Sequence, residues 1–211
     1  MNNVKNIIAE NKIIAVIRGV YGEKLYGLLN ALKLGKIKVA EITFGDKSDA
    51  ETRDVIADAV QKFGEEMLIG AGTVTTQDRA YYALQAGAKF TVSPDCDSEV
   101  IEYVKQRGGF CISGAFTPTE VKHAFVCGAD MVKIFPSDMA GEKYFSDLKG
   151  PFPNFPLVAF GGITRKNIRS FLDAGAVGAG VGGDLIRKDL IAAGDFAQIN
   201  EIAKQFAEAV K

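Results

Sequence analysis

A lysine inside an apolar run is the first feature of this sequence that could do chemistry. Lys133 lies within residues 129–135, a short and mostly apolar stretch that follows Gly128 and ends at Pro136. This pattern predicts a buried β-strand, and lysine is rarely buried unless it is paired or used in a reaction. The ordinary alternative is a lysine at the solvent end of the strand, paired with a carboxylate.

Three further polar residues, Arg18, Glu41 and Thr73, stand in or directly after other short apolar runs. Side chains alternate between the two faces of a strand, so each polar residue shares a face with the residues two positions away. The residues that share a face are Arg18 with Ile14 and Val16, Glu41 with Val39 and Thr43, Thr73 with Ala71, and Lys133 with Met131. We expect these sets to face one interior, with the polar residues at or near the carboxyl ends of their strands.

An inward lysine and an inward glutamate form a chemically meaningful pair. Burial favours the neutral amine of Lys133, which is the nucleophile that forms a Schiff base with a ketone. A nearby Glu41 carboxylate can move protons as the imine forms and breaks. The alternative is a buried Lys133–Glu41 ion pair with a purely structural role, and such pairs often stabilise no better than apolar packing.

These residues need a scaffold, and the sequence alternates β-like and helix-like segments eight times. The expected strands are residues 13–17, 37–44, 67–73, 89–93, 109–113, 129–135, 157–160 and 177–181. Helical spacing or helix boundaries indicate helices near 22–34, 48–63, 74–86, 97–107, 118–126, 141–149 and 166–174, with more helix up to residue 211.

Strand–helix alternation predicts a parallel sheet with right-handed crossovers. Eight units predict an α/β fold, the closed (β/α)8 or TIM barrel, as a single domain over 1–211 with an extra N-terminal helix at 2–10. An open doubly wound sheet is the alternative, but it normally has fewer strands and a GxGxxG turn, which is absent after the first strand. Polar residues at the carboxyl ends of barrel strands are typically catalytic.

Two double glycines are the second chemical signal. Gly161-Gly162 and Gly182-Gly183 end the seventh and eighth expected strands. Loops at these positions, with the N-terminus of a short helix, commonly bind phosphate in such barrels because bare N–H groups can approach the anion. The alternative is two tight turns that need glycine for a positive φ.

Composition narrows the function further. A net charge of −1 and the lack of a basic run argue against a nucleic-acid or anionic-membrane surface. We expect a cytoplasmic protein, because no apolar stretch could span a bilayer and the first residues lack a secretory pattern. The three cysteines lack CxxC spacing and are expected to be reduced, buried thiols. His123 is the only histidine, so a histidine-based metal site or a Ser-His-Asp triad is excluded, and we expect no metal or cofactor.

Taken together, the sequence resembles the 2-keto-3-deoxy-6-phosphogluconate (KDPG) and 2-keto-4-hydroxyglutarate (KHG) aldolases, which are class I pyruvate aldolases. The resemblance covers the whole chain, and several motifs occur in the family's order. These motifs are Ala15–Gly19, Glu41-Ile42-Thr43, Gly70–Val74, Ser93-Pro94, Thr117–Glu120, Lys133–Pro136, Gly161-Gly162-Ile163 and Gly180–Gly183.

The resemblance implies a role for each matched residue. Lys133 would form the Schiff base, and Glu41 would be the general acid and base, partly through a water molecule. Thr73 would contact the carbinolamine and the bound pyruvate. Pro94 and Phe135 would line the pocket, and Gly161, Gly162, Gly182 and Gly183 would hold the substrate phosphate. The resemblance implies a homotrimer that needs no metal. It also implies that the enzyme releases pyruvate together with glyceraldehyde 3-phosphate, or together with glyoxylate when 2-keto-4-hydroxyglutarate is the substrate.

Three positions depart from the family pattern. Gly45 replaces an arginine that binds the pyruvate carboxylate in many members, and Arg18 resembles the replacement seen in others. Phe160 stands where threonine or valine is common, so it would narrow the pocket or change the C4 stereochemistry that fits. Asp184 stands near the phosphate and would repel it, unless it caps its own helix.

These departures leave several alternatives open. The substrate could be the C4 epimer, 2-keto-3-deoxy-6-phosphogalactonate, or an acid without phosphate. A different phosphate-binding barrel, such as a sugar-phosphate epimerase, and a non-catalytic ligand-binding barrel are the alternatives outside the family.

Overall fold

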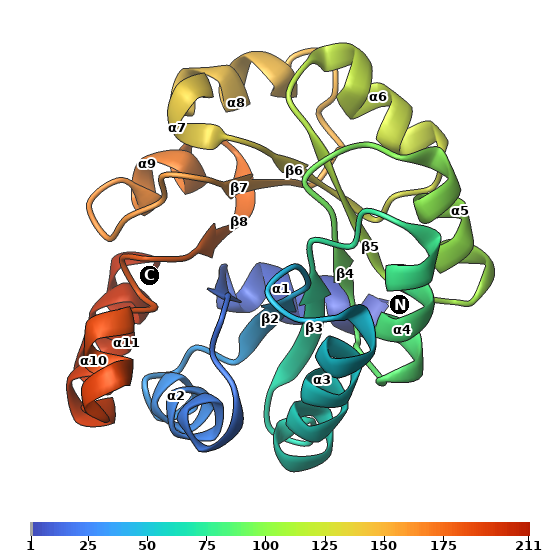
Figure 1. Cartoon of the computed structure of the whole chain (residues 1–211). Coiled ribbons are helices and arrows are strands. Elements are labelled where there is room, and N and C mark those ends of the chain that lie inside the picture. Colours follow the sequence, from blue (N-terminus) through green and yellow to red (C-terminus); the bar gives the residue numbers. More distant parts are fainter. Residues whose placement is uncertain (1) are drawn as a thin grey trace.

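The computed structural model describes residues 2–211, which form a closed barrel of eight parallel strands in sequential order (Figure 1). The strands are β1 (Ile13–Ile17), β2 (Val39–Thr43), β3 (Leu68–Gly72), β4 (Thr91–Val92), β5 (Cys111–Ala115), β6 (Met131–Ile134), β7 (Leu157–Phe160) and β8 (Ala176–Val181). β1 pairs with both β2 and β8, which closes the sheet. The predicted TIM barrel is confirmed.

Helices surround the barrel and follow the strands in the predicted alternation (Figure 1). They are α1 (Asn2–Asn11), α2 (Gly22–Leu34), α3 (Asp49–Phe63), α4 (Gln77–Gln85), α5 (Ser98–Gln106), α6 (Pro118–Val126), α7 (Ser137–Ala140), α8 (Glu142–Lys149), α9 (Ile168–Asp173), α10 (Lys188–Ala193) and α11 (Phe196–Ala209). The residues around two helix N-termini explain why these helices begin there. Ser48 with Glu51 and Thr117 with Glu120 form capping boxes that satisfy the first N–H groups of α3 and α6.

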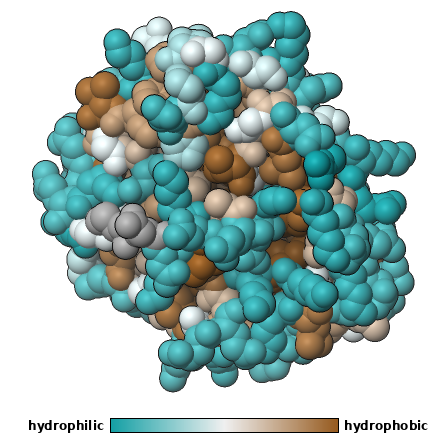
Figure 2. Space-filling view, turned by 180° about the vertical axis from the view of Figure 1, so that it is seen from behind, coloured by the Kyte–Doolittle hydropathy of each residue, from teal (hydrophilic) through white to brown (hydrophobic). Residues whose placement is uncertain are grey.

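The first helix closes the end of the barrel at which the strands begin. α1 packs against β1, β2 and β8, and Ile8 belongs to the apolar cluster inside the barrel. This confirms the extra N-terminal helix and leaves the carboxyl ends of the strands as the open end. The face behind the view of Figure 1 is mostly hydrophilic, with apolar residues between the polar ones (Figure 2).

Two apolar clusters fill the fold, one inside the barrel and one between the barrel and its helices. The inner cluster contains Ile14, Val39, Met131, Val158 and Phe160, among others. The outer cluster contains the residues that alternate with them along the strands, such as Ala15, Ala40, Ile42, Val132 and Ala159. Strand alternation therefore assigns faces as expected for β1, β2 and β6.

The structure corrects several details of the expected elements. β4 has only two residues, Thr91 and Val92, instead of the expected run over 89–93. β5 is Cys111–Ala115 rather than 109–113. The short helix α7 precedes α8, and the sequence pattern predicted only the second of these helices. None of the helices in residues 2–211 is long and apolar enough to cross a membrane.

Candidate active site

Lys133 is buried in the interior of the barrel, near the carboxyl end of β6. Its exposed fraction is 7%, and its Nζ lies 4.7 Å from the ring centre of Phe135 and 4.6 Å from that of Phe160. Among the ion pairs and hydrogen bonds of residues 2–211, none involves this Nζ. Burial lowers the pKa of Lys133, partly offset by Glu41, while Arg18 lowers it further. The amine is therefore poised toward its neutral, nucleophilic form.

Glu41 is the second buried ionisable group, with an exposed fraction of 2%. Burial raises its pKa to about 7, although the positive charges of Lys133 and Arg18 act in the opposite direction. Its Oε2 is fully buried and has no hydrogen-bond partner within the described chain. A carboxyl group that titrates near neutrality can both accept and donate a proton at physiological pH.

A glycine makes room for this carboxylate. A Cβ atom added to Gly72 on β3 would lie 2.6 Å from Glu41 Oε1, closer than real Cβ atoms come to another heavy atom. Gly180 on β8 is its counterpart for Phe160, because a Cβ there would overlap the Phe160 ring. The sequence indicates that both are strand-packing glycines, and the side chain that each one accommodates becomes clear only from the structure.

Arg18 and Thr73 form a polar pair at the carboxyl ends of β1 to β3. Arg18 donates from Nη2 to Thr73 Oγ1 at 2.8 Å and from Nη1 to the carbonyl of Phe44 at 3.3 Å. A Cβ on Gly45 would lie 3.6 Å from Arg18 Nη1, so the guanidinium group lies beside the position where the family pattern often has an arginine. The exposed guanidinium can still offer donors to a carboxylate.

Thr73 lines the cavity, but the prediction that it faces inward because it shares a strand face with Ala71 is wrong. Its partner in strand alternation, Ala71, packs in the outer cluster, whereas Gly70 and Gly72 face the interior. Thr73 has φ +59°, a left-handed conformation that breaks the alternation after β3. The side chain therefore reaches Arg18 and the cavity through a backbone turn and not through strand parity.

A cavity of about 440 Å³ lies at the carboxyl ends of the strands. All of the sequence-predicted site residues line it, namely Arg18, Glu41, Thr73, Pro94, Lys133, Phe135, Phe160, Gly161, Gly162, Gly182 and Gly183. Val16, Ile163, Thr164, Gly180 and Asp184 also line it. Of these five, only Asp184 was discussed from the sequence as a residue near the substrate. Thr164 could have been suspected because it is a hydroxyl-bearing residue two positions after the first double glycine.

The two glycine loops differ from the expected phosphate site in one respect. After β8 the chain forms a turn, in which the N–H groups of Leu185 and Ile186 both bond to the carbonyl of Gly182, and no helix starts there. Asp184 therefore does not cap a helix of its own, which was the condition under which its carboxylate would not oppose a phosphate. Its Oδ2 accepts a 2.9 Å hydrogen bond from the backbone N–H of Arg165, in the loop after β7.

The amides of the double glycines are free to bind an anion. Within residues 2–211, the N–H groups of Gly161, Gly162, Gly182 and Gly183 donate to no protein acceptor. Gly161 and Gly162 have φ of +90° and +67°, which only glycine adopts without strain. A Cβ on Gly182 or Gly183 would meet open space, so packing does not require glycine there. The lack of a side chain instead leaves the backbone N–H groups accessible to a ligand.

The cysteines and the histidine lie away from this chemistry. All three cysteines are free, Cys111 is buried, and Cys96 and Cys127 are only half-buried, which corrects the expectation that all are buried. His123 is exposed on α6 with Cys127 Sγ near its ring. In the described part of the chain, no group of three or more histidine, cysteine, aspartate or glutamate residues could hold a metal ion.

Comparison with known proteins assigns this arrangement to a family. A family model for the KDPG and KHG aldolases matches residues 4–202. The chain belongs to the KDPG and KHG aldolase family. The family consists of lyases, and the protein is an aldolase with the Schiff-base architecture of that family.

The similar relatives in this aldolase family differ in the substrate that they are named for. A 2-dehydro-3-deoxy-6-phosphogalactonate aldolase of Escherichia coli is 32% identical over 94% of this chain and 96% of its own length. A 2-dehydro-3-deoxy-phosphogluconate aldolase of Treponema pallidum is also 32% identical, over 94% and 93%. The KDPG aldolase of Legionella pneumophila, solved with pyruvate captured at low pH as a covalent carbinolamine intermediate, is 26% identical, with a TM-score of 0.87 over 95% and 96% of the two chains.

Proposed function

We propose that the protein cleaves a 2-keto-3-deoxy-6-phospho-aldonate to pyruvate and glyceraldehyde 3-phosphate through a Schiff base on Lys133. The observation that carries this proposal is a buried, unpaired lysine that shares one cavity with a buried glutamate titrating near pH 7. The same site would cleave 2-keto-4-hydroxyglutarate to pyruvate and glyoxylate.

Each end of the substrate has a matching group in the cavity. Arg18 and Thr73 would bind the carboxylate next to the reacting ketone, because a guanidinium group forms strong charge-assisted bonds with a carboxylate. The free amides of the glycine loops after β7 and β8 would bind the phosphate at the other end. Pro94, Phe135 and Phe160 would exclude water around the imine.

The reaction uses these groups in sequence. Lys133 Nζ attacks the C2 ketone, and the resulting carbinolamine loses water to give the protonated imine. Glu41 then removes the proton of the C4 hydroxyl, directly or through a water molecule, and the C3–C4 bond breaks. The bonding electrons pass into the imine to form an enamine while the aldehyde departs. Protonation at C3 and hydrolysis of the imine release pyruvate and restore the amine.

Borohydride trapping tests the covalent step. We expect reduction in the presence of pyruvate to add one pyruvyl group to Lys133, located by peptide mass spectrometry. The Lys133→Met variant should give no adduct and no cleavage, while its circular dichroism spectrum stays that of a folded barrel. An adduct on another lysine, or cleavage by the variant, would refute the assignment.

The C4 epimer is a second candidate substrate, and the structure gives it specific support. Phe160 presents an apolar ring where family members often have threonine or valine, and this larger side chain would narrow the pocket or change which C4 stereochemistry fits. Relatives of both names match this chain equally well, at 32% identity. Cleavage rates for the gluconate and galactonate epimers, measured side by side with 2-keto-4-hydroxyglutarate, decide between them.

The oligomeric state is part of the proposal as well. We expect a homotrimer, as the resemblance to the family implies. A protein cage designed by fusing symmetric oligomeric domains contains a segment that is 31% identical to this chain, with a TM-score of 0.85, which supports a symmetric assembly. Light scattering coupled to size exclusion would give three times 22.6 kDa if the proposal holds and another multiple if it does not.

A further inference from the structure

Two fully buried side-chain oxygens in the interior of the barrel have no hydrogen-bond partner within residues 2–211. They are Oε2 of Glu41 and Oγ1 of Thr43. Thr43 has an exposed fraction of 2%, the same as that of Glu41. A buried polar atom without a partner disfavours the folded state, so native proteins contain few of them. Two such oxygens on one strand, two positions apart, point to a common hydrogen-bonding role.

Both side chains pack against the same glycine of the neighbouring strand. Thr43 is the last residue of β2 and shares a strand face with Glu41, because side chains alternate along a strand. A Cβ on Gly72 of β3 would lie 2.6 Å from Glu41 Oε1 and 2.9 Å from Thr43 Cγ2. The methyl group of Thr43 therefore faces β3 beside the carboxyl group of Glu41.

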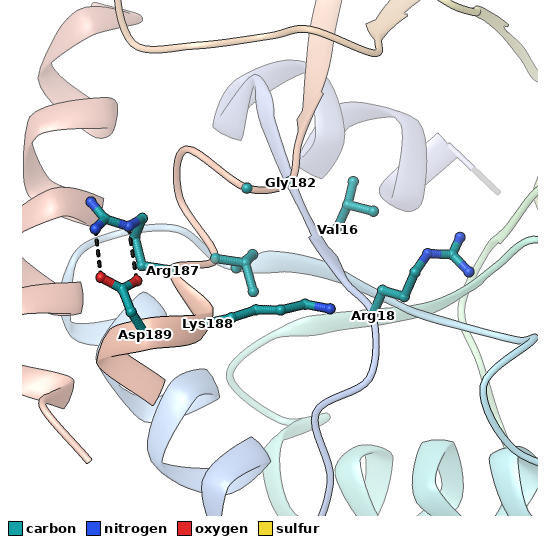
Figure 3. Close-up of a pocket in the computed structure, with 8 residues that line it drawn as sticks. Val16, Arg18, Gly182, Arg187, Lys188 and Asp189 are labelled. Carbon is teal, nitrogen blue, oxygen red and sulfur yellow. Dashed lines mark hydrogen bonds and ion pairs between the residues drawn. The ribbon is translucent and has the colours of Figure 1, made fainter. Parts of the chain in front are cut away.

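The side chain of Arg18 crosses β2 directly after Thr43. The next step of the β1–β2 register places Arg18 opposite Thr43. From there its guanidinium group points away from Lys188 (Figure 3) and donates to the carbonyl of Phe44 and to Thr73 Oγ1. Within residues 2–211 these bonds do not include the Thr43 hydroxyl, so the arginine is not its partner.

The carboxyl group of Glu41 is the acceptor that suits this hydroxyl. Burial raises the pKa of Glu41, and the charged groups that act on it, Lys133 of β6 and Arg18 of β1, lower it. A hydrogen bond donated to a carboxylate also favours the ionised form, and a water molecule can transmit such a bond. Because the two unpartnered oxygens form no direct hydrogen bond, a single bridging water molecule would satisfy both.

We propose that Thr43 is a positioning residue for proton transfer, whose hydroxyl donates through one bound water molecule to Oε2 of Glu41 and so stabilises the ionised carboxylate. This inference rests on the proposed function, because it concerns the same proton transfer. Thr43 is not among the described residues that line the reaction cavity, so it acts through Glu41 and not on the substrate. The hydroxyl and the water molecule keep their protons, while Oε1 of Glu41 accepts the transferred proton and returns it.

The pH profile for exchange of the pyruvate methyl protons with deuterated water tests the role of Thr43. In Thr43→Val, which keeps the methyl group on Gly72, we expect the inflection to move up by about one pH unit and the rate at pH 7 to fall about fivefold, because the carboxylate loses a hydrogen bond. The KM for pyruvate should not change. Thr43→Ser restores the hydroxyl and should restore the inflection. Thr91→Val, at a buried threonine on the outer face of β4, is the matched control and should keep the parent profile.

Carbon-13 NMR of labelled glutamate carboxyl groups separates this proposal from the proposed function. The Glu41 resonance, assigned by its loss in Glu41→Gln, should titrate at a higher pH in Thr43→Val than in the parent protein, whether or not the protein turns over an acid. Thr43→Ala removes the same hydroxyl with a smaller side chain, so the test does not depend on the folding of one variant. If the parent protein exchanges no pyruvate protons, the aldolase assignment fails, and the NMR titration still decides the role of Thr43.

Three results would overturn the role of Thr43. One is a Glu41 titration that stays at the parent pH in both Thr43→Val and Thr43→Ala. Another is an equal shift in Thr43→Ser or in Thr91→Val, which would show that the hydroxyl at position 43 is not the cause. The third is a rise in the KM for pyruvate without a change in the inflection, which would assign the hydroxyl to substrate binding instead.

Discussion

Glu41 shows how one residue gains a role from its surroundings. An exposed glutamate is ionised at neutral pH, whereas burial raises the pKa of this carboxyl group to about 7. The nearby Lys133 and Arg18 keep the pKa from rising further. A residue of this kind can serve as base when the C4 hydroxyl loses its proton and as acid when C3 is protonated.

Exchange of the pyruvate methyl protons with deuterated water tests this role. The enamine forms only if a base removes a methyl proton from the imine, so the exchange rate should rise with pH around an inflection near 7. Glu41→Gln should still form some imine, exchange more slowly by about a hundredfold, and lose the inflection. An unchanged rate and profile in Glu41→Gln would remove Glu41 from the mechanism.

The position of Arg18 leads to a separate prediction about binding of the pyruvate carboxylate. Its guanidinium group bonds to Thr73 and lies beside Gly45, at the position of the carboxylate-binding arginine of many family members. Arg18→Ala should raise the KM for pyruvate in the condensation direction by about tenfold or more, since a charge-assisted bond is lost. The KM for the aldehyde should change little. Arg53→Ala is a control on the outer helix α3, and its kinetics should equal those of the parent protein.

Residue types and alternation along the strands predicted the two buried ionisable groups of the candidate site, and the family resemblance supplied most of the other residues that line its cavity. Glu41 and Lys133 face inward as their alternation with Val39 and Met131 indicated. Thr73 could not be assigned in this way, because its left-handed φ is a property of the turn and leaves no mark in strand periodicity. The bond of Asp184 to Arg165 was equally hidden, since it joins two loops that are 19 residues apart in sequence.

At the scale of elements, the strands place small residues where a functional side chain must cross a neighbouring strand. Gly72 is paired with Thr43 in the register of β2 and β3, and Glu41 lies across it. Gly180 is paired with Phe160 in the register of β7 and β8, and the Phe160 ring covers it. The sequence predicts packing glycines at these positions, but not which side chain each one admits, because that depends on register.

Gly72→Ala tests this coupling between an element and the site. The added methyl group would overlap Glu41 Oε1, so the carboxylate must move although the β-strand itself accepts alanine. We expect kcat to fall by about tenfold or more, because misplacing a catalytic group slows the reaction by such factors. Borohydride trapping on Lys133 should persist. Ala71→Gly in the same strand is the control: it removes a methyl group from the outer cluster and should lower stability but leave kcat unchanged. An undiminished kcat in Gly72→Ala would show that the carboxylate needs no such space.

Element boundaries illustrate what the sequence can and cannot predict. Strand–helix alternation predicted all eight strands, because each unit carries its own apolar run and glycine or proline stop. β4 shrank to Thr91 and Val92 because strand length is set by pairing with β3 and β5, which the sequence of one run does not contain. The same limit explains the shift of β5.

At the scale of the whole molecule, the buried ionisable groups of the candidate site lower the stability of the folded protein. The inner cluster surrounds Glu41 and Lys133, which have opposite charges but no direct bond to each other. Removing both groups from water opposes folding, and the attraction between them returns only part of that free energy. Barrel and outer cluster must therefore supply the stability that the site lacks, as is common where function requires buried charge.

The pH dependence of unfolding should reveal this conflict. The pKa of Glu41 rises from 4.5 to about 7 on folding, so the folded state binds the proton more tightly. Its unfavourable contribution is absent below pH 4.5, grows between 4.5 and 7, and is complete above 7. Glu41→Gln should therefore be more stabilising at pH 8 than at pH 5. The difference is up to about 3 kcal/mol, because each pKa unit corresponds to about 1.4 kcal/mol.

Urea unfolding of parent and variant at the two pH values measures this difference. Glu102→Gln, at an exposed position on α5, is the matched control and should shift the unfolding free energy equally at both pH values. Lys133 acts in the opposite direction, since its pKa is lowered on folding and its unfavourable contribution fades as the pH rises toward 10.5. Lys133→Met should therefore be stabilising at both pH 5 and pH 8. A Glu41→Gln effect that does not grow with pH would mean that the carboxyl group is ionised in the folded barrel as readily as in the unfolded chain, and the proton-transfer role argued for it would lose its physical basis.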